Sequence, residues 1–222
     1  MSLVSEFLTI DSDVDDGVDV ELEVKRSRFL TRLRRVTSEE TARAVIDEQR
    51  SRFFDARHHC SAFVLGAEGR AARSSDDGEP AGTAGVPMLN VLTSNHLTDV
   101  VAVVTRYFGG IKLGAGGLVR AYSEAVAHAV ATVGTRRVEL CTLLGIDADF
   151  ANIGTLENSL RGAVLTSGVN VTVEGVDWGD RARITVAVPV TATGEFNSFL
   201  SALSAGSLTA HPTGQRWVDH LG

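Results

Sequence analysis

The chain has 222 residues, of which 44% are hydrophobic and 22% charged, and its formal net charge is −7. This composition excludes disordered and fibrous classes, and the length allows two domains with separate hydrophobic cores. No basic residue precedes Lys25 and no apolar run is long enough to cross a bilayer, so we expect a cytoplasmic protein without a secretory signal or membrane span. Cys60 and Cys141 are then expected to be reduced thiols.

Charge is distributed unevenly along the sequence. Residues 1–24 hold eight acids and no Lys or Arg, residues 25–57 hold ten Lys or Arg against five acids, and residues 138–222 hold four against nine. Because local charge governs a specific site, the acidic total argues against a non-specific nucleic-acid coat but leaves a basic patch on the first domain. The alternative is that the acidic segments simply neutralise the basic one.

The expected elements of the first part begin with a flexible lead-in over residues 1–17, where acids cluster in DSDVDDG. A first domain is expected over residues 18–137. VDVELEV alternates apolar and acidic residues as a strand does, and KRSRFLTRLRRV continues as a second strand. The segment Thr37–Glu40 offers a hydroxyl N-cap and acids for the first turn of a helix. The elements expected next are a strand at HHCSAFVLG, a loop at SSDDGEPAGTAG, a helix at VPMLNVLTSN, a strand at DVVAVVTRYFGG, and a helix at GLVRAYSEAVAHAVATVG that stops at Gly134.

A second domain is expected over residues 138–222, after a short junction at Thr135–Arg137. VELCTLLGIDADF predicts a strand, NIGTLENSLRGA a helix, VNVTVEGVDW and ARITVAVPV two strands joined by a tight turn, and GEFNSFLSALSAG a helix. The order βαββα, with a final strand in LTAHPTGQRWV, is the ferredoxin-like pattern, so the expected fold class is α+β.

The segment FGGIKLGAGGLVRAY places five glycines between a buried strand and a helix. Such a junction exposes backbone N–H groups at the positive end of a helix, and Lys112 and Arg120 add cations, so an anion site is expected. Tight turns and close helix–sheet packing are the alternative explanation of the glycines. Neither a Walker A loop nor the dinucleotide fingerprint is present, because the latter needs glycine where Val119 stands.

The upstream loop carries three carboxylates within four residues, in SDDGEP. They suit a divalent cation, the arginines of the basic segment, or a solvated turn. In the neighbouring strand, His58 and Cys60 face one side and His59 the other, so at most two of them can share a metal. A histidine paired with a carboxylate of the loop is the expected arrangement, and no metal or cofactor is predicted.

The blocks KRSRF, DARHHC, SDDGEPAGTAGVPML and RYFGGIKLGAGGLVRAY resemble the signature blocks of the IMPACT/YigZ family in order and separation, over nearly all of residues 20–137. The resemblance implies a ribosomal protein S5 domain 2-like N-terminal domain and a ferredoxin-like C-terminal domain similar to those of elongation factor G. It also implies that the two glycine-rich loops meet at one sheet edge. Both folds are frequent in proteins that contact RNA or the ribosome, although a fold does not establish a function. Eukaryotic relatives regulate translation through an additional N-terminal domain that binds a kinase activator, and that partner is not carried over.

The leading hypothesis is a non-enzymatic regulatory protein that binds RNA or a ribosome-associated polyanion, with no catalytic residue assigned and no oligomeric state predicted. Alternatives are an enzyme acting on a phosphorylated small molecule at the glycine-rich loops and a protein-interaction adaptor using the acidic second domain. The candidate RNA-binding residues are Lys25, Arg26, Arg28, Arg106, Tyr107, Lys112, Gly114, Gly116, Gly117 and Arg120, with Phe108 as a second stacking candidate. The candidate site-lining residues are His58, His59, Asp76, Asp77, Glu79 and Thr83.

Overall fold

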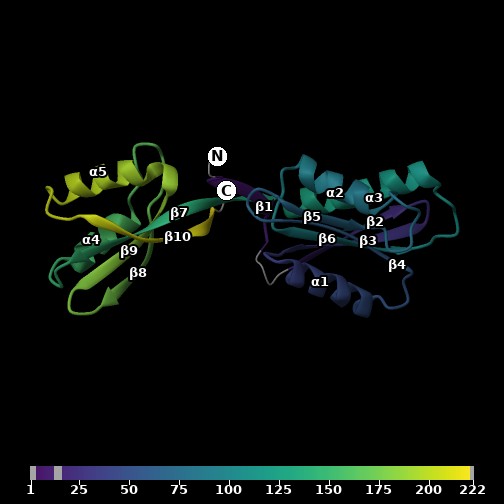
Figure 1. Cartoon of the computed structure of the whole chain (residues 1–222), viewed down its shortest axis with the longest axis horizontal. Helices are drawn as coiled ribbons and strands as arrows, with labels where there is room; N and C mark the ends of the chain where they lie inside the picture. Colours follow the sequence, from purple (N-terminus) through teal and green to yellow (C-terminus); the bar gives the residue numbers. More distant parts are fainter. Residues whose placement is uncertain (1–3, 13–16, 221–222) are drawn as a thin grey trace. The chain divides into compact units, whose positions relative to one another are not determined.

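A computed structural model describes residues 4–12 and 17–220 of the chain (Figure 1). The packing of the backbone divides these residues into two compact units. One, the N-terminal unit, is built from residues 7–137, and the other, the C-terminal unit, from residues 138–220 together with residues 4–6.

The N-terminal unit is built on an antiparallel sheet in the order β2-β3-β6-β4-β5. Its strands are β2 (Gly17–Val24), β3 (Ser27–Arg35), β4 (His58–Leu65), β5 (Ala71–Ser75) and β6 (Val100–Tyr107). Strand β6 is central and almost wholly apolar because helices cover both faces of the sheet. Helices α2 (Gly85–Ser94) and α3 (Ala115–Val133) cover one face and α1 (Glu39–Arg52) the other (Figure 1).

Local sequence explains where the helices of this unit begin and end. Helix α1 starts after Ser38, whose hydroxyl accepts the N–H of Thr41 while the Thr41 hydroxyl accepts the N–H of Ser38. Helix α3 runs for 19 residues and ends at Gly134, whose φ of +80° suits a glycine cap. Its start is different, because Gly114 at the N-cap provides no side chain to satisfy the first backbone N–H groups.

The hairpin that joins β2 and β3 presses its tip against the glycine-rich loop. Lys25 and Arg26 fill a two-residue turn and both have positive φ, +48° and +65°, as a type I′ turn requires. A Cβ atom at Gly109 would overlap the backbone of Arg26, and the Gly109 N–H donates to Ser27 Oγ at 3.2 Å. The hairpin tip and the loop after β6 are therefore held together by a contact that only glycine allows.

The C-terminal unit is built on an antiparallel sheet with the path β1-β7-β9-β8, in which β10 also pairs with β7. The elements of this sheet and its helices are β1 (Glu6–Ile10), β7 (Thr135–Ala148), α4 (Ile153–Arg161), β8 (Thr172–Trp178), β9 (Ala182–Pro189), the 3₁₀ turn η1 (Val190–Ala192), α5 (Thr193–Leu203) and β10 (Ala210–His220). Of these, residues 7–10 of β1 and 135–137 of β7 belong to the N-terminal unit. Helices α4 and α5 pack with alternate residues of β7 and β9 into one core, so they cover one face of the sheet. The other face carries a cross-strand ion pair between Asp147 and Arg183 at 2.6 Å.

Most of the expected elements are confirmed, and three are corrected. Residues 6–10 of the expected flexible lead-in form β1, because Phe7, Thr9 and Ile10 are buried; residues 1–3 and 13–16 lie outside the described part. The polar segment AARSS forms β5, although the sequence predicts a loop for its last two residues, because its backbone pairs with β4. The expected junction at Thr135–Arg137 is the first part of β7. No helix among the described residues is long and apolar enough to cross a bilayer.

The close approach at Gly109 predicts that Gly109→Ala lowers the free energy of unfolding by about 1–3 kcal/mol, because the added methyl group must displace backbone. Gly116→Ala is the matched control, since a Cβ there meets nothing within 4 Å and alanine favours a helix. Urea unfolding of both variants measures the difference, and equal stabilities would contradict the contact.

Candidate functional site

Three sequence blocks that are far apart in the chain meet where β4 begins and β6 ends. Their register is fixed by the pairing of His58 with Arg106 across the two strands. Together they form a cleft of about 610 Å³, which we call the glycine-loop cleft. Its lining residues are Asp55, Ala56, Arg57, His58, Glu79, Pro80, Arg106, Tyr107, Phe108, Lys112, Leu113, Gly114, Ala115 and Leu118.

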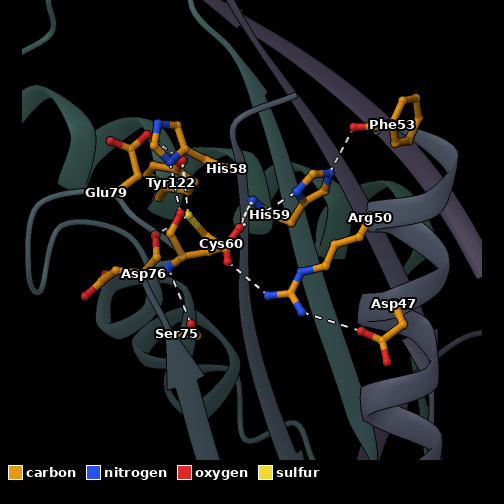
Figure 2. Close-up of polar contacts among 11 residues, drawn as sticks. Asp47, Arg50, Phe53, His58, His59, Cys60, Ser75, Asp76, Glu79 and Tyr122 are labelled. Atoms are coloured by element: carbon orange, nitrogen blue, oxygen red, sulfur yellow. Dashed lines mark hydrogen bonds and ion pairs between the residues drawn. The ribbon is translucent and has the colours of Figure 1, made fainter. Parts of the chain in front are cut away.

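A buried ion pair lies in the wall of this cleft. Arg106 Nη1 donates to Glu79 Oε1 at 2.6 Å, and the two side chains are only 8% and 4% exposed. The Tyr122 hydroxyl, from α3, donates to the same carboxylate oxygen at 2.9 Å, and Cys60 Sγ lies 3.3 Å from that hydroxyl. The network therefore ties β4, the acidic loop, β6 and α3 to one another. Figure 2 shows Cys60, Tyr122 and Glu79 of this network.

Burial changes the chemistry of the groups in this network. It raises the pKa of the Cys60 thiol to about 12, so the thiolate needed of a nucleophile is not formed at neutral pH. It also raises the pKa of the Tyr122 hydroxyl, which stays a neutral donor. The sequence predicts that Arg106 contacts phosphate, but its Nη1 is committed to Glu79. Its Nε has no hydrogen-bond partner in the described part of the chain.

Asp76 holds the acidic loop closed on the start of α2. Its carboxylate accepts the backbone N–H groups of Gly82, Ala84 and Gly85 at 2.8–3.0 Å. Burial by itself would raise the pKa of Asp76, but these three hydrogen bonds to the charged form outweigh it and lower the pKa. Thr83 supports the same loop, since its hydroxyl donates to the carbonyl of Pro80 at 2.7 Å.

Asp77 fastens the loop to β4 and to α1. One carboxylate oxygen accepts the backbone N–H of His59 at 2.6 Å, and the other accepts Arg50 Nη2 at 2.9 Å, where Arg50 reaches across from α1 (Figure 2). The Asp77 carbonyl lies 3.0 Å from His58 Nδ1. His59 Nε2 lies 3.2 Å from the carbonyl of Phe53, which can only accept, so this nitrogen carries the hydrogen. Burial lowers the pKa of His59, so the ring is neutral at pH 7.

The three carboxylates of the acidic loop are therefore used by backbone amides and arginines. Of the three uses that the sequence left open, the structure shows the pairing with arginine at Asp77 and Glu79 and a turn-closing role at Asp76. Among residues 4–12 and 17–220 there is no group of three or more His, Cys, Asp or Glu side chains arranged to hold a metal ion.

Exposed cations surround the mouth of the cleft. Arg57 and Lys112 line it, and both are exposed. Neither side chain makes an ion pair or hydrogen bond within the described residues, and the same is true of Lys25, Arg26 and Arg120, which lie outside the lining. Arg28, by contrast, is held by both oxygens of Glu21, at 2.6 and 3.0 Å. Arg57 and Lys112 thus place positive charge at the cleft that no described carboxylate neutralises.

The start of α3 forms one side of the cleft. Gly114 has a φ of +73°, and no side chain of the described residues caps the N–H groups that follow it. The first helical hydrogen bond runs from the N–H of Leu118 to the Gly114 carbonyl at 2.9 Å. A Cβ at Gly114 would meet nothing within 4 Å, so the helix start is open. Uncapped N–H groups in such a position favour an anionic ligand.

The structure brings together only part of the residues that the sequence singled out. Those that line the cleft are Arg106, Tyr107, Lys112, Gly114, His58 and Glu79, whereas Lys25, Arg26, Arg28, Gly116, Gly117, Arg120, His59, Asp76, Asp77 and Thr83 do not. Sequence reasoning missed Asp55, Arg57 and Ala115. Arg57 carried a signal, because it lies within the DARHHC block, but the block alone does not show which of its side chains faces the cleft.

Comparisons with known proteins place this architecture among relatives. The family model for the Impact N-terminal domain matches residues 25–130. The chain is 38% identical over 196 residues to the IMPACT family member YigZ of Escherichia coli (strain K12), covering 86% of this chain and 92% of that protein. A crystal structure of a hypothetical protein matches 96% of this chain and 99% of its own length with a TM-score of 0.59 and 35% identity. The two-domain translational regulator Yih1 matches 55% of this chain and 46% of its own length, with 29% identity and a TM-score of 0.32.

Removal of one partner of the buried Glu79–Arg106 pair should destabilise the folded protein. Glu79→Gln leaves the Arg106 guanidinium without its counter-charge, and we expect the free energy of unfolding to fall by about 3–5 kcal/mol. The double variant Glu79→Gln/Arg106→Met removes both charges, so its destabilisation should be smaller than the sum of the two single effects. Urea unfolding measures this cycle, and strictly additive effects would contradict a coupled pair. Glu21→Gln breaks an exposed pair and should change stability little.

The capture of backbone N–H groups by Asp76 predicts a pH-dependent stability. Because the folded-state pKa of Asp76 is lowered, its contribution is present at neutral pH and is lost as the pH falls through that folded-state value. Asp76→Asn should therefore be destabilised at pH 7, and its difference from the wild type should shrink below about pH 4. Unfolding free energies at several pH values test this, and a constant difference would argue against it.

Proposed function

The chain belongs to the IMPACT family. We propose that it is a regulatory protein of translation, as its family resemblance implies, and that it binds single-stranded RNA with the cleft of its N-terminal unit. The observation that carries the proposal is the glycine-loop cleft. There Arg57 and Lys112, two cations without a partner among the described residues, lie beside the open start of α3.

The chemistry of the cleft suits RNA in single-stranded form. Phe108 is 60% exposed and, like Tyr107, lines the cleft, so an aromatic face is available for a base to stack on. Lys112 and Arg57 supply positive charge that attracts the phosphates. Backbone N–H groups at the start of α3 can donate hydrogen bonds that orient a phosphate. The overall charge of −7 opposes binding of polyanions elsewhere on the chain.

The enzyme alternative has less support from the described residues. The Cys60 thiol is buried and its pKa is raised to about 12, and Glu79 is occupied by Arg106 and Tyr122, so neither is available as nucleophile or base. His58 and Asp55 do line the cleft, but His58 Nδ1 contacts the Asp77 carbonyl and Asp55 accepts the Tyr107 hydroxyl at 2.7 Å. Binding requires no such group.

We also propose the finer fold assignment that the resemblance implied. The strand order β10-β7-β9-β8, with α4 and α5 in one core, supports a ferredoxin-like C-terminal unit. The N-terminal unit, with helices on both faces of an antiparallel sheet, is proposed to be ribosomal protein S5 domain 2-like.

Titration of labelled single-stranded RNA at several salt concentrations tests the proposed function. Lys112→Ala and Arg57→Ala should each weaken binding and flatten the dependence of log affinity on log salt by roughly 0.7 for each phosphate that is no longer bound. Arg181→Ala, which removes an exposed arginine from the C-terminal unit, is the matched control and should behave as the wild type. Circular dichroism checks folding. Identical affinities and slopes in all four proteins would rule out this cleft as the RNA site.

A further inference from the structure

We propose that the glycine-loop cleft is an end site, which binds the terminal phosphomonoester of a nucleotide, at the end of an RNA strand or in a free nucleoside monophosphate. The inference deepens the proposed function and, for the strand, rests on it. It follows from where free charge lies, from the donors that face the cleft, and from the size of the space.

Two of the cations that are unpaired within the described residues line the cleft, whereas three others, Lys25, Arg26 and Arg120, lie outside its lining. Several arginines of α1 and of the β2–β3 hairpin are neutralised by carboxylates: Arg28 by Glu21, Arg32 by Asp19, Arg34 by Glu48, Arg43 by Glu39, Arg50 by Asp77 and Arg52 by Asp19. Arg57 and Lys112 are unpaired within the described residues and both line the cleft. A long strand needs cations along its path, whereas the end of a strand presents its charge at a point.

Several kinds of hydrogen-bond donor belong to residues that line the cleft. The uncapped start of α3 provides backbone N–H groups beside Gly114 and Ala115, and Lys112 and Arg57 provide charged donors. Arg106 is only 7% exposed, lines the cleft, and has an Nε without a partner in the described chain. Its guanidinium is held by Glu79 and by Ser27 Oγ, so it contributes positive charge to the wall of the cleft. A terminal phosphate carries three acceptor oxygens and about −1.5 to −2 charges at pH 7, so it fits this donor set.

The charges that line the cleft favour such a ligand overall, because three cations, Arg57, Arg106 and Lys112, outnumber two acids. Asp55 accepts the hydroxyl of Tyr107, and Glu79 is paired with Arg106. The cleft volume of about 610 Å³ lies within the range of small-ligand sites, and it has the exposed ring of Phe108 at its lining for the base of the terminal nucleotide. The space is suited to a nucleotide and its phosphate rather than to a long segment of chain.

Binding of one short RNA with three kinds of end tests this inference. The full chain is titrated with the same oligonucleotide carrying a 5′-phosphate, a 3′-phosphate or only hydroxyl ends, and separately with adenosine monophosphate and adenosine. We expect a phosphate-bearing ligand to bind at least about tenfold more tightly than its hydroxyl counterpart. If the monophosphate competes as well as the phosphorylated strand, the source is the free nucleotide; if only the strand competes, the source is the strand end. Both results support binding of a terminal phosphomonoester in the cleft.

Ala115→Glu is the decisive variant. Ala115 is exposed and is the first residue of α3, where an acid favours the helix, so the protein should fold while a carboxylate takes the place of the phosphate. The preference for phosphate should disappear in it. Ala127→Glu introduces the same charge at an exposed position further along α3 and should keep the preference.

The outcomes separate this inference from the proposed function. Equal affinity for phosphorylated and hydroxyl-ended RNA would overturn the end site and leave RNA binding in place. Binding of adenosine monophosphate without any binding of RNA would support the phosphate site and overturn the RNA proposal. A protein that binds none of the ligands at low salt would overturn both. A preference that Ala115→Glu retains in full would overturn this cleft as the end site.

Discussion

The arrangement of the N-terminal unit depends on one buried ion pair, between the carboxylate of Glu79 and the guanidinium of Arg106. Glu79 belongs to a loop, whereas Arg106 belongs to the central strand, so neither charge can be buried unless the loop is folded back on the end of β6. The hydrogen bond from Tyr122 to Glu79 also requires that α3 pack at a fixed position against the loop and β6. Because an uncompensated buried charge is expensive, these three segments are expected to take their places together. The walls of the glycine-loop cleft are a result of this constraint.

The two glycine-rich loops serve this arrangement in different ways. Gly109 permits the close approach of two backbones, and Gly114 turns the chain into α3 with a positive φ and leaves the helix start uncovered. The acidic loop is closed by a side chain instead. The Asp76 carboxylate accepts backbone N–H groups of Gly82 and Gly85, and these hydrogen bonds replace the ones that regular secondary structure would provide. The packing explanation of the glycines and the anion-site explanation therefore apply to different residues of the same segment.

The fold was predictable where a pattern is long and the packing regular. Strand β6 is a nearly unbroken apolar run, and α3 has apolar residues at helical spacing and a terminal glycine, so both were predicted from sequence. Strands β1 and β5 were not, because they are five residues long and β5 is an edge strand whose residues are mostly small and polar. The partners of Asp76 and Asp77 were also beyond sequence reasoning, since they come from α1, β4 and backbone amides that only the tertiary fold brings near. Arg57 was missed for the same reason.

The β2–β3 hairpin has two successive non-glycine residues with positive φ. A turn of this type is most easily formed by Asn-Gly, yet Lys25 and Arg26 hold both left-handed positions. Side chains with a Cβ adopt such angles at a cost of roughly 1–3 kcal/mol each, so the unit gives up stability to keep two cations here. The hairpin tip is therefore a place where the backbone of this unit is strained, and a residue without a Cβ at either position would relieve that strain.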